Sequence, residues 1–312
     1  MSSFKELGER ELVRRIKDAI RIDSGMAPSD DAAVLGIGGG LAVSTDQVSF
    51  KRHLPSGMSN RQFGWYAAAV CFSDLAAMGA RPVGFLSALS IDENMDEEDI
   101  IQIMVGIDEC ADSCGTYVIG GDTKPGCGMV TGTALGCMDG RLPLSRSGAS
   151  PGDMVAVTGT LGNAAAGIHM LERGVGDAVR NVNMILPLPR LEEGIAMAEG
   201  NLATACMDLS DSLFTSLNII CEESNVGIEI MREFIPMGED VEFASKSLNM
   251  DTLDLVARWG GDYELLFTFN PNNLEQLHAL SMDFTIIGVV TDGPGAFIVD
   301  GEDRRRISDG IY

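Results

Sequence analysis

Aspartate is the residue type whose placement in this chain first suggests chemistry. Asp74 lies in the segment 72–79, FSDLAAMG, where small and apolar residues surround it. A carboxylate in an apolar helix is costly unless it is paired or bound to a metal ion, so a functional role for Asp74 is the favoured interpretation. Further aspartates stand in loops or at the ends of predicted elements, where α/β proteins build their sites. They are Asp30, Asp31, Asp46, Asp122, Asp208, Asp211 and Asp262.

Several of these aspartates also have a purely structural interpretation. Asp30 and Asp31 could form a turn or a helix cap, and Asp46 could cap a loop. Asp122 could close a turn in the sequence GGDT, and Asp211 could cap the helix that follows it. As a set, however, they offer carboxylate oxygens, which Mg²⁺ prefers together with water and phosphate oxygens. Such carboxylates would repel a polyphosphate without metal ions and hold it with them, so the pattern favours a magnesium–nucleotide site.

The common nucleotide and metal motifs are absent from the sequence. There is no GxxxxGK[ST] phosphate loop, no GxGxxG and no His-Arg-Asp triplet of protein kinases. The three histidines, His53, His169 and His278, are far apart and lack the spacing of a zinc site. The seven cysteines include no CxxC pair, which argues against a disulfide framework. Metal ions are therefore the physical means by which this acidic chain could hold ATP.

The charge of the chain excludes two classes of partner. It has 22 Lys and Arg against 46 Asp and Glu, a formal net charge of −24 and a pI near 4.3. Such a surface repels nucleic acid and anionic membranes, so neither is expected as a partner. Solubility in a salty cytoplasm is the alternative explanation for the excess acid. The N-terminus, MSSFKE, lacks the pattern of a signal peptide and no apolar run approaches a membrane span, so the protein is expected in the cytoplasm.

Chain length and the order of predicted elements favour two α/β domains. The 312 residues, 45% of them hydrophobic, suffice for two cores. The turn-rich stretch 145–153, SRSGASPGD, places the boundary near residue 143, which gives domains 1–142 and 143–312. Helices are expected at 4–22, 59–78, 96–114, 163–173, 190–199 and 211–224. Strands are expected at 32–35, 41–45, 83–91, 117–119, 130–135, 154–159, 227–231, 263–269, 284–290 and 295–299.

At these residues the chain resembles the thiamine-monophosphate kinases, a family of the PurM-like ATP-binding superfamily. Eight motifs occur in the family's order between about residues 25 and 293. They are Asp30-Asp31, STD at 44–46, SDLAAMGA at 73–80, GGDT at 120–123, SRSGA at 145–149 with Gly152-Asp153, VTGTLG at 157–162, DLSD at 208–211 and DYEL at 262–265. Each motif is weak by itself, whereas eight in order are specific.

The resemblance implies a fold, a partner and a set of site residues. The fold is α/β, of the two-domain α+β kind, with an N-terminal PurM-like sheet domain that pairs in a homodimer and binds ATP and Mg²⁺, and a C-terminal α/β domain. The metal ligands would be Asp30, Asp31, Ser44, Thr45, Asp46, Asp74, Asp122, Asp208 and Asp211. ATP would be contacted by Gly121, Asp122, Arg146 and Ser210. The acceptor would be contacted by His53 and Tyr312, and catalysis would involve Asp122, Arg146 and Asp211.

The implied reaction is direct in-line transfer of the γ-phosphoryl group of ATP to the phosphate of thiamine monophosphate. Because the acceptor phosphate is already ionised at pH 7, catalysis would rest on positioning and charge neutralisation. One alternative is a paralogous PurM-like kinase or ligase with another acceptor. The other is a catalytically silent nucleotide-binding scaffold, which would have lost metal-ligand aspartates. Two departures from the family concern the acceptor: Gly261 stands in place of a glutamate, and the sequence ends in DGIY.

Overall fold

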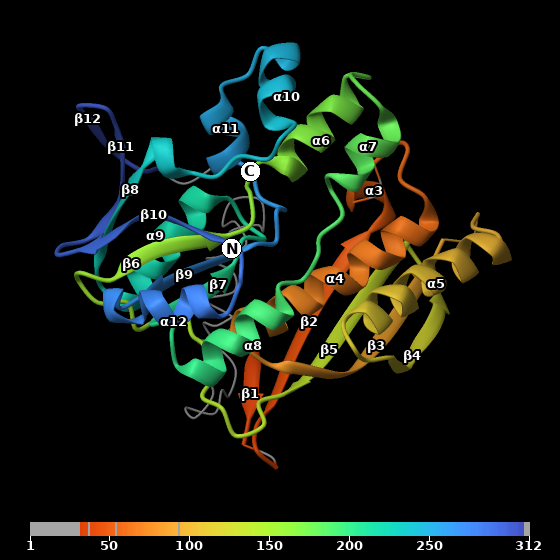
Figure 1. Ribbon diagram of the computed structural model, residues 1–312. Helices are drawn as coiled ribbons and strands as arrows, with labels where there is room; N and C mark the ends of the chain where they lie inside the picture. Colours follow the sequence, from red (N-terminus) through yellow and green to blue (C-terminus); the bar gives the residue numbers. More distant parts are fainter. Residues whose placement is uncertain (1–31, 37, 54, 93, 309–312) are drawn as a thin grey trace, which may run out of the picture.

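Two β-sheets organise the chain, which the computed structural model describes over residues 32–36, 38–53, 55–92 and 94–308. The first domain contains β1 (Ala33–Leu35), β2 (Leu41–Ser49), α3 (Phe50–His53), α4 (Asn60–Met78), β3 (Arg81–Ile91), α5 (Glu97–Ser113), β4 (Val118–Pro125) and β5 (Met129–Cys137) (Figure 1). The predicted helix 4–22, Asp30, Asp31 and Tyr312 lie outside the described residues.

The second domain begins with β6 and carries the remaining elements. They are β6 (Met154–Thr158), α6 (Asn163–Glu172), α7 (Ala178–Asn183), α8 (Leu191–Gly200), β7 (Ala205–Asp208), α9 (Leu213–Ser224), β8 (Gly227–Met231), η1 (Arg232–Phe234), α10 (Val241–Leu248), α11 (Thr252–Ala257), β9 (Leu265–Phe269), η2 (Pro271–Asn273), α12 (Leu274–Ala279), β10 (Phe284–Thr291), β11 (Gly295–Asp300) and β12 (Asp303–Arg306). The two-domain α/β architecture is confirmed, and the boundary at residue 143 stays a prediction.

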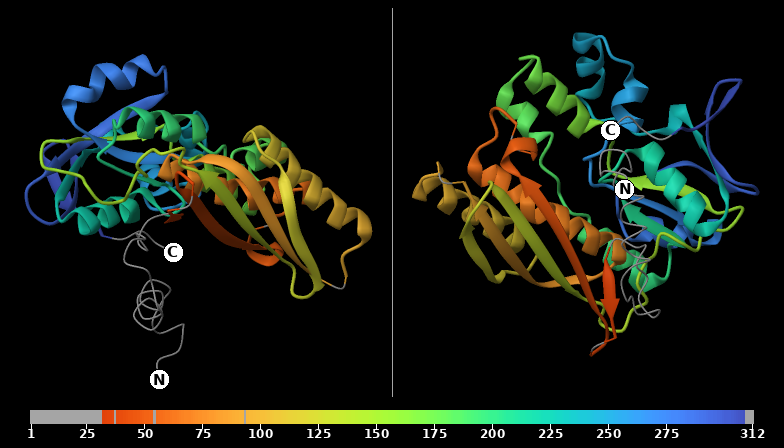
Figure 2. Two further views of the ribbon diagram at one scale, coloured as in Figure 1. Left: turned by 90° about the horizontal axis from the view of Figure 1, so that it is seen from below. Right: turned by 180° about the vertical axis from the view of Figure 1, so that it is seen from behind.

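In the part of the chain that the structure describes, helices cover one face of the first sheet. Its strand order is β1-β2-β5-β3-β4, antiparallel except for the β3–β4 pair. Along β5, Val130 and Ala134 are buried on the face that α4 and α5 cover, whereas Thr131 and Thr133 alternate onto the other face and stay half-exposed. Seen from behind in Figure 2, the strands lie in front of these helices. We call the uncovered side the open face.

Helix α4 begins and ends as the sequence predicts. Ser59 accepts a hydrogen bond from the backbone of Gln62 and forms a capping box with it, and Gly79 ends the helix with φ of 68°. A left-handed residue at this position favours glycine because it has no Cβ to clash. These caps fix where Asp74, in the last turn but one of the helix, meets its neighbours.

Helix α4 also joins the two domains. It packs on α5 and β2 in the first domain and on α8 and β7 in the second. A Cβ on Gly64 would lie 2.0 Å from the carbonyl oxygen of Ile103, and one on Gly194 would lie 1.9 Å from that of Ala76. Because both approaches are backbone to backbone, only glycine fits at the two positions. One hydrophobic cluster consequently runs without a break from the first sheet into the second.

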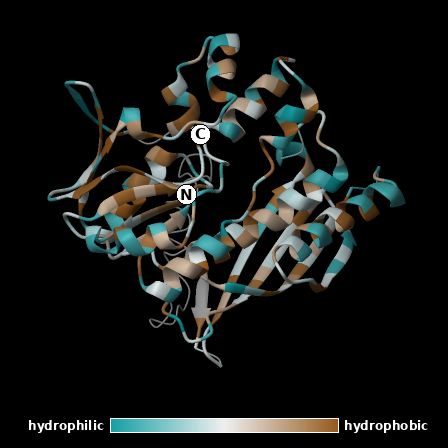
Figure 3. Cartoon of the chain, in the orientation of Figure 1, coloured by the Kyte–Doolittle hydropathy of each residue, from teal (hydrophilic) through white to brown (hydrophobic). Residues whose placement is uncertain are grey.

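The second sheet is covered on both faces. Its order is β12-β11-β8-β10-β6-β9-β7, antiparallel except for β8–β11. Val155 and Val157 of β6 join the cluster that contains α9, while Ala156 points to the cluster shared with α4. The brown colour of much of this sheet in Figure 3 marks the hydrophobic residues of its strands. The predicted strands of this domain are confirmed, whereas β7, β12, α7, α10, α11 and α12 have no counterpart in the prediction.

No helix within the described ranges is both long enough and apolar enough to cross a membrane.

Candidate functional site

Two of the predicted carboxylates, Asp74 and Asp208, are bound by serines where β2, α4 and β7 meet. The Oγ of Ser44 donates a hydrogen bond to Oδ2 of Asp74. The Oγ of Ser73, one residue earlier in α4, donates to Oδ2 of Asp208 at 2.7 Å. Asp46 lies two residues after Ser44, on the same face of β2. We call Asp46, Asp74 and Asp208 the carboxylate cluster. It runs from solvent into the interior, because Asp46 is exposed and Asp208 is 1% exposed.

The potential at the cluster is strongly negative. Burial raises the pKa of the Cys71 thiol well above its ordinary value, and the charges of Asp46 and Asp74 raise it further. Burial likewise raises the pKa of Tyr66, with a contribution from the charge of Asp46. Neighbouring carboxylates in a partly buried site are costly unless cations balance them. The cluster is therefore suited to metal ions, whereas the protonated Cys71 is unsuited to nucleophilic chemistry.

The loop after β7 is held by the segment before β9. Ser210 Oγ donates to Oδ1 of Asp208 at 3.1 Å. The backbone N–H of Gly261 donates to the carbonyl of Ser210 at 2.9 Å, and that of Tyr263 donates to the carbonyl of Leu209 at 3.1 Å. These bonds extend the pairing of β7 with β9 past the end of the sheet. The predicted ATP contact Ser210 thus has a backbone fixed by residues some fifty positions later in the chain.

The structural interpretation of Asp211 is wrong. The N-cap of α9 is Ser212, whose side chain accepts from the backbone of Thr215. Asp211 instead packs on Gly260, where a Cβ would lie 2.9 Å from the Cα of Asp211 and 2.2 Å from the carbonyl oxygen of Ser210. This close approach requires glycine at position 260. Asp211 therefore lies in the loop after β7 and does not cap α9.

Two tyrosines that the sequence analysis did not select complete the junction. The hydroxyl groups of Tyr66 in α4 and Tyr263 before β9 are 3.0 Å apart, and their rings meet edge to face at 6.0 Å between centroids. The charges of Asp46 and Asp208 contribute to the raised pKa of Tyr263, whose first cause is burial. Tyr263 lies in the DYEL motif, but no sequence signal links it to Tyr66, because the residues are 197 positions apart and a tyrosine in an apolar helix is typical of a core.

A cavity of about 320 Å³ opens beside Tyr66. We call it the His53 cavity. Its lining combines bases (Lys51, Arg52, His53), apolar side chains (Pro55, Ile168, Leu171, Ile185), Tyr66, Ser56 and Glu172. The first domain supplies the bases and the second supplies Ile168, Leu171 and Glu172. Two cations at one cavity are notable in so acidic a chain, and they suit an anionic group next to an apolar one.

His53 lies in this cavity as a neutral side chain. Burial lowers the pKa of its imidazole below the ordinary value, and the neighbouring charge of Arg52 lowers it further. The Nδ1 atom accepts a hydrogen bond from the backbone N–H of Ser49 at 3.0 Å. The neutral ring therefore carries its proton on Nε2, which makes it a hydrogen-bond donor. The structure places the predicted acceptor contact in a cavity; its role stays a prediction.

Thr45 and Asp122 are not brought to the carboxylate cluster within one chain. Both were expected near strand ends, and this is wrong, because β2 continues to Ser49 and β4 to Pro125. Thr45 Oγ1 donates to the carbonyl of Gly132 at 2.7 Å on the open face. Asp122 lies three strands away from β2, roughly 14 Å at ordinary interstrand spacing, also on the open face.

The neighbours of Asp122 have local structural reasons. A Cβ on Gly121 would lie 1.8 Å from the carbonyl oxygen of Ser87, so the β3–β4 pairing requires glycine there. Asp122 itself is exposed; its Oδ1 accepts from the backbone of Thr123 and lies 3.5 Å from the Lys124 ammonium. Within one chain, Asp122 does not reach the carboxylate cluster. Its predicted metal and catalytic roles therefore require other groups near it.

Arg146 lies in the segment that comes after the last strand of the first sheet in the sequence. This segment runs beside β7. The carbonyl of Ser145 accepts from the backbone N–H of Cys206 at 2.7 Å, and the carbonyl of Arg146 accepts from Ser224 Oγ at 3.4 Å. The half-buried Arg146 is thus anchored through its backbone beside the strand that ends in Asp208. A guanidinium offers phosphate a planar fork of donors.

Within the described ranges, no group of three or more His, Cys, Asp or Glu side chains is already gathered closely enough to hold a metal ion. Mg²⁺ commonly takes one or two carboxylates and fills its remaining positions with water and substrate phosphate oxygens. The carboxylate oxygens of the cluster are ligands of the kind that Mg²⁺ prefers.

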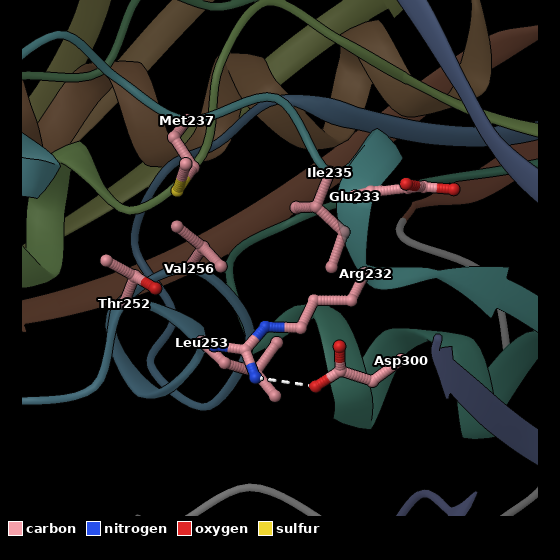
Figure 4. A pocket seen from close by; sticks show the side chains of 8 residues that line it. All are labelled: Arg232, Glu233, Ile235, Met237, Thr252, Leu253, Val256 and Asp300. Carbon is pink, nitrogen blue, oxygen red and sulfur yellow. Dashed lines mark hydrogen bonds and ion pairs between the residues drawn. The ribbon is translucent and has the colours of Figure 1, made fainter. Parts of the chain in front are cut away.

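A second cavity, of about 280 Å³, lies elsewhere in the second domain and contains none of the predicted site residues. In Figure 4 the Arg232 guanidinium reaches Asp300, with the apolar side chains of Ile235, Met237 and Val256 across from it. Arg232 also donates to Asp251 at 2.9 Å. Its charge is accordingly balanced by the protein itself.

The fold and the domain-spanning cluster define a two-domain protein of the AIR synthase related class. The family model described as "AIR synthase related protein, N-terminal domain" matches residues 29–138, and that described as "AIR synthase related protein, C-terminal domain" matches residues 150–301. The first match covers every strand of the first sheet, and the second covers the second sheet from β6 to β11, leaving out β12.

Within that class, the similarities are to thiamine-monophosphate kinases. The chain is 36% identical over 301 residues to that of Methanopyrus kandleri, covering 95% of this chain and 94% of the relative. It is 36% identical over 292 residues to that of Methanospirillum hungatei, covering 92% and 93%. A solved structure described as AaThiL complexed with AMPPCP and TMP superposes with a TM-score of 0.86 at 25% identity, covering 98% of both chains. The chain belongs to the thiamine-monophosphate kinase family.

Proposed function

We propose that this protein phosphorylates thiamine monophosphate to thiamine diphosphate at the expense of ATP. The observation that carries the proposal is the carboxylate cluster at the domain junction, with the base-lined His53 cavity beside it. A family relative of the same fold is described in complex with AMPPCP, an analogue of ATP, and TMP. The retained aspartates Asp46, Asp74, Asp208 and Asp211 argue against the silent scaffold.

Mg²⁺ would be held by Asp46, Asp74 and Asp208 together with phosphate oxygens. Bound there, it would supply positive charge that balances both the carboxylates and the polyphosphate. The chain's own part is orientation: Ser44 and Ser73 fix the two carboxylates through hydrogen bonds, and the Ser210 loop is fixed by Gly261. Arg146 would donate to the nucleotide phosphates. Asp30 and Asp31 remain proposed ligands.

The acceptor would occupy the His53 cavity. Lys51 and Arg52 match its phosphate, and the Nε2 proton of His53 offers a further donor. The apolar wall matches its rings, and Glu172 is the carboxylate in the lining that could face the positively charged thiazolium. The acceptor phosphate needs no general base, which agrees with a neutral His53 acting as a donor rather than as a proton acceptor.

We also infer a cytoplasmic homodimer whose first sheets pair through their open faces. Val83 and Leu86 of β3 are each 36% exposed, and Ile119 of β4 is 46% exposed. Apolar side chains gathered on an uncovered sheet face favour association. Asp122 is exposed on the same face, so pairing would place it at the interface rather than in bulk solvent.

The experiment is turnover of thiamine monophosphate with ATP and Mg²⁺, with thiamine diphosphate read by chromatography. We expect product from the wild type, at least a hundredfold less from Asp208→Asn, and wild-type rates from Asp112→Asn, an exposed aspartate of α5. Mg²⁺-dependent ATP binding without product would favour a paralogous kinase or ligase with another acceptor. ATP binding without phosphoryl transfer to any acceptor tried would favour the catalytically silent nucleotide-binding scaffold.

A further inference from the structure

We propose that the Tyr66–Tyr263 hydroxyl pair is a positioning element of the transfer site, which holds the Tyr66 ring as a wall of the acceptor cavity while tying it to the loop that carries Asp208. The inference rests on the proposed function, because it assigns the His53 cavity to the acceptor. It concerns two residues that neither metal nor nucleotide recognition requires.

The pair connects the two halves of the site through a single contact. Tyr66 belongs to α4, eight residues before Asp74, and lines the His53 cavity. Tyr263 belongs to the second domain and donates its backbone N–H to Leu209, the residue after Asp208. The hydroxyl–hydroxyl distance of 3.0 Å is that of a hydrogen bond. Tyr263 thus contacts both the residue that follows Asp208 and the ring that the acceptor would touch.

The backbone of Tyr263 has an unusual conformation for a bulky residue. Its φ is 53°, a left-handed conformation that a bulky residue seldom adopts and that costs on the order of 1–3 kcal/mol. The side chain is 8% exposed, and its hydroxyl is the buried end of an otherwise apolar ring. The fold keeps this conformation with both the N–H and the hydroxyl of Tyr263 bonded, which orients the hydroxyl toward α4.

The ring of Tyr66 also has the His53 imidazole as a neighbour. It lies nearly parallel to the His53 imidazole, with 22° between the planes and 6.3 Å between centroids. The edge of Tyr263 meets it at 83°. Tyr66 is therefore oriented from two directions, with part of its surface left for the cavity. A flat aromatic wall of this kind discriminates between acceptors by shape and stacking.

The test is a set of conservative variants assayed for both substrates. Tyr66→Phe, Tyr263→Phe and the double variant keep the rings and remove the hydroxyls, and Tyr117→Phe, at an exposed tyrosine, is the matched control. We expect each single variant to raise the KM for thiamine monophosphate about fivefold, the net worth of one hydrogen bond, with the KM for ATP within twofold of wild type. The double variant should be no worse than either single one, because one contact is lost in all three.

Several results would overturn the inference. Unchanged KM for the acceptor in both single variants, with or without a lower melting temperature, would leave the pair a purely structural contact. Equal rises in the KM values of both substrates, or additive effects in the double variant, would contradict acceptor positioning. Tyr66→Ala, which removes the wall itself, should raise the acceptor KM further than Tyr66→Phe does. Wild-type protein that makes no thiamine diphosphate would instead sink the proposed function, and the acceptor role of the pair with it.

Discussion

The Oγ of Ser73 donates a 2.7 Å hydrogen bond to Oδ2 of Asp208, and this contact joins the two domains inside the protein. Ser73 is fully buried and Asp208 is 1% exposed. The serine precedes the metal-ligand candidate Asp74, so consecutive residues of α4 contact both domains: Ser73 donates to Asp208 of the second, and Asp74 accepts from Ser44 of the first. The geometry of the carboxylate cluster is therefore set by how the domains pack.

Replacing Ser73 by alanine tests this dependence. A hydrogen bond to a buried charged group contributes about 1.5–3 kcal/mol, so Ser73→Ala should lower the free energy of unfolding by that amount. It should also raise the KM for Mg²⁺-ATP while leaving the KM for the acceptor nearly unchanged. Urea unfolding and steady-state kinetics measure the two effects. Ser113→Ala, which removes a hydroxyl bonded to a carbonyl of α5, is the control and should leave both KM values at the wild-type level.

Arg190 is expected to matter for stability more than surface arginines do. Its guanidinium binds Glu264 through two hydrogen bonds of 2.6 Å, and the Glu264 side chain is 10% exposed. Arg190→Ala leaves this carboxylate buried without its cation and should cost about 3–5 kcal/mol in urea unfolding. Arg61→Ala breaks the ion pair with Glu109, in which the Arg61 side chain is 53% and the Glu109 side chain 40% exposed. This variant should lower the free energy of unfolding by less than about 1 kcal/mol. Equal losses in the two variants would contradict this ranking.

Asp262 should make stability fall with rising pH. Burial raises its pKa to about 7, against the lowering effect of hydrogen bonds from the backbone of Gly162 and Ala164 at the start of α6. Because the unfolded carboxyl has a pKa near 3.9, the folded state binds the proton more tightly, and the free energy of unfolding decreases between about pH 4 and pH 7.

The variant Asp262→Asn cannot ionise, but its single amide oxygen replaces only one of the two carboxylate oxygens that accept from Gly162 and Ala164. The lost acceptor lowers stability at every pH, so the ionisation of Asp262 is measured by how the difference from wild type changes with pH. The stability of the variant relative to wild type should therefore be more favourable at pH 8 than at pH 5, as measured by urea unfolding at both values. A difference that does not change with pH would show that Asp262 is already ionised in the fold at pH 5.

The open face provides a test of the homodimer. Leu86→Arg places a charge among apolar side chains of β3 and β4 and should convert a dimer into a monomer in analytical ultracentrifugation. Leu188→Arg alters a leucine that is 64% exposed and lies outside the first sheet, so it should leave the dimer intact. A wild-type monomer at micromolar concentration, or a dimer that survives Leu86→Arg, would refute pairing through this face.

Local signals in the sequence predicted the main helices, and long-range contacts explain what was missed. Ser59 and Gly79 delimit α4 because capping depends on residues close in sequence. Strand β2 was predicted to stop near Asp46, yet pairing with β5 carries it to Ser49; the Gln47 amide, for example, donates to Thr131. Such pairing has no local signature, since it depends on a partner strand far along the chain.

The site residues were likewise predicted from local motifs, whereas their directions in the sheet were not. The resemblance indicated Asp46, Asp74 and Asp208; the structure binds Asp74 to Ser44 and Asp208 to Ser73, and the metal role of all three stays a prediction. The resemblance could not indicate that Thr45 and Asp122 would face the other side of the sheet, because side-chain direction follows from strand register. Asp30, Asp31 and Tyr312 lie outside the described residues, and their roles stay predictions.

The backbone contacts of Gly64 and Gly194 should also affect how fast the amides of α4 exchange with solvent. A helix held this tightly between α5 and α8 can expose its amides only when both domains separate. Its amides should therefore be among the slowest in the molecule to exchange with deuterated solvent, opening only with global unfolding. Asp74 and Ser73 would then lie on the last segment to open, so that the half of the site proposed to bind metal persists through local fluctuations that open the exposed loops around it.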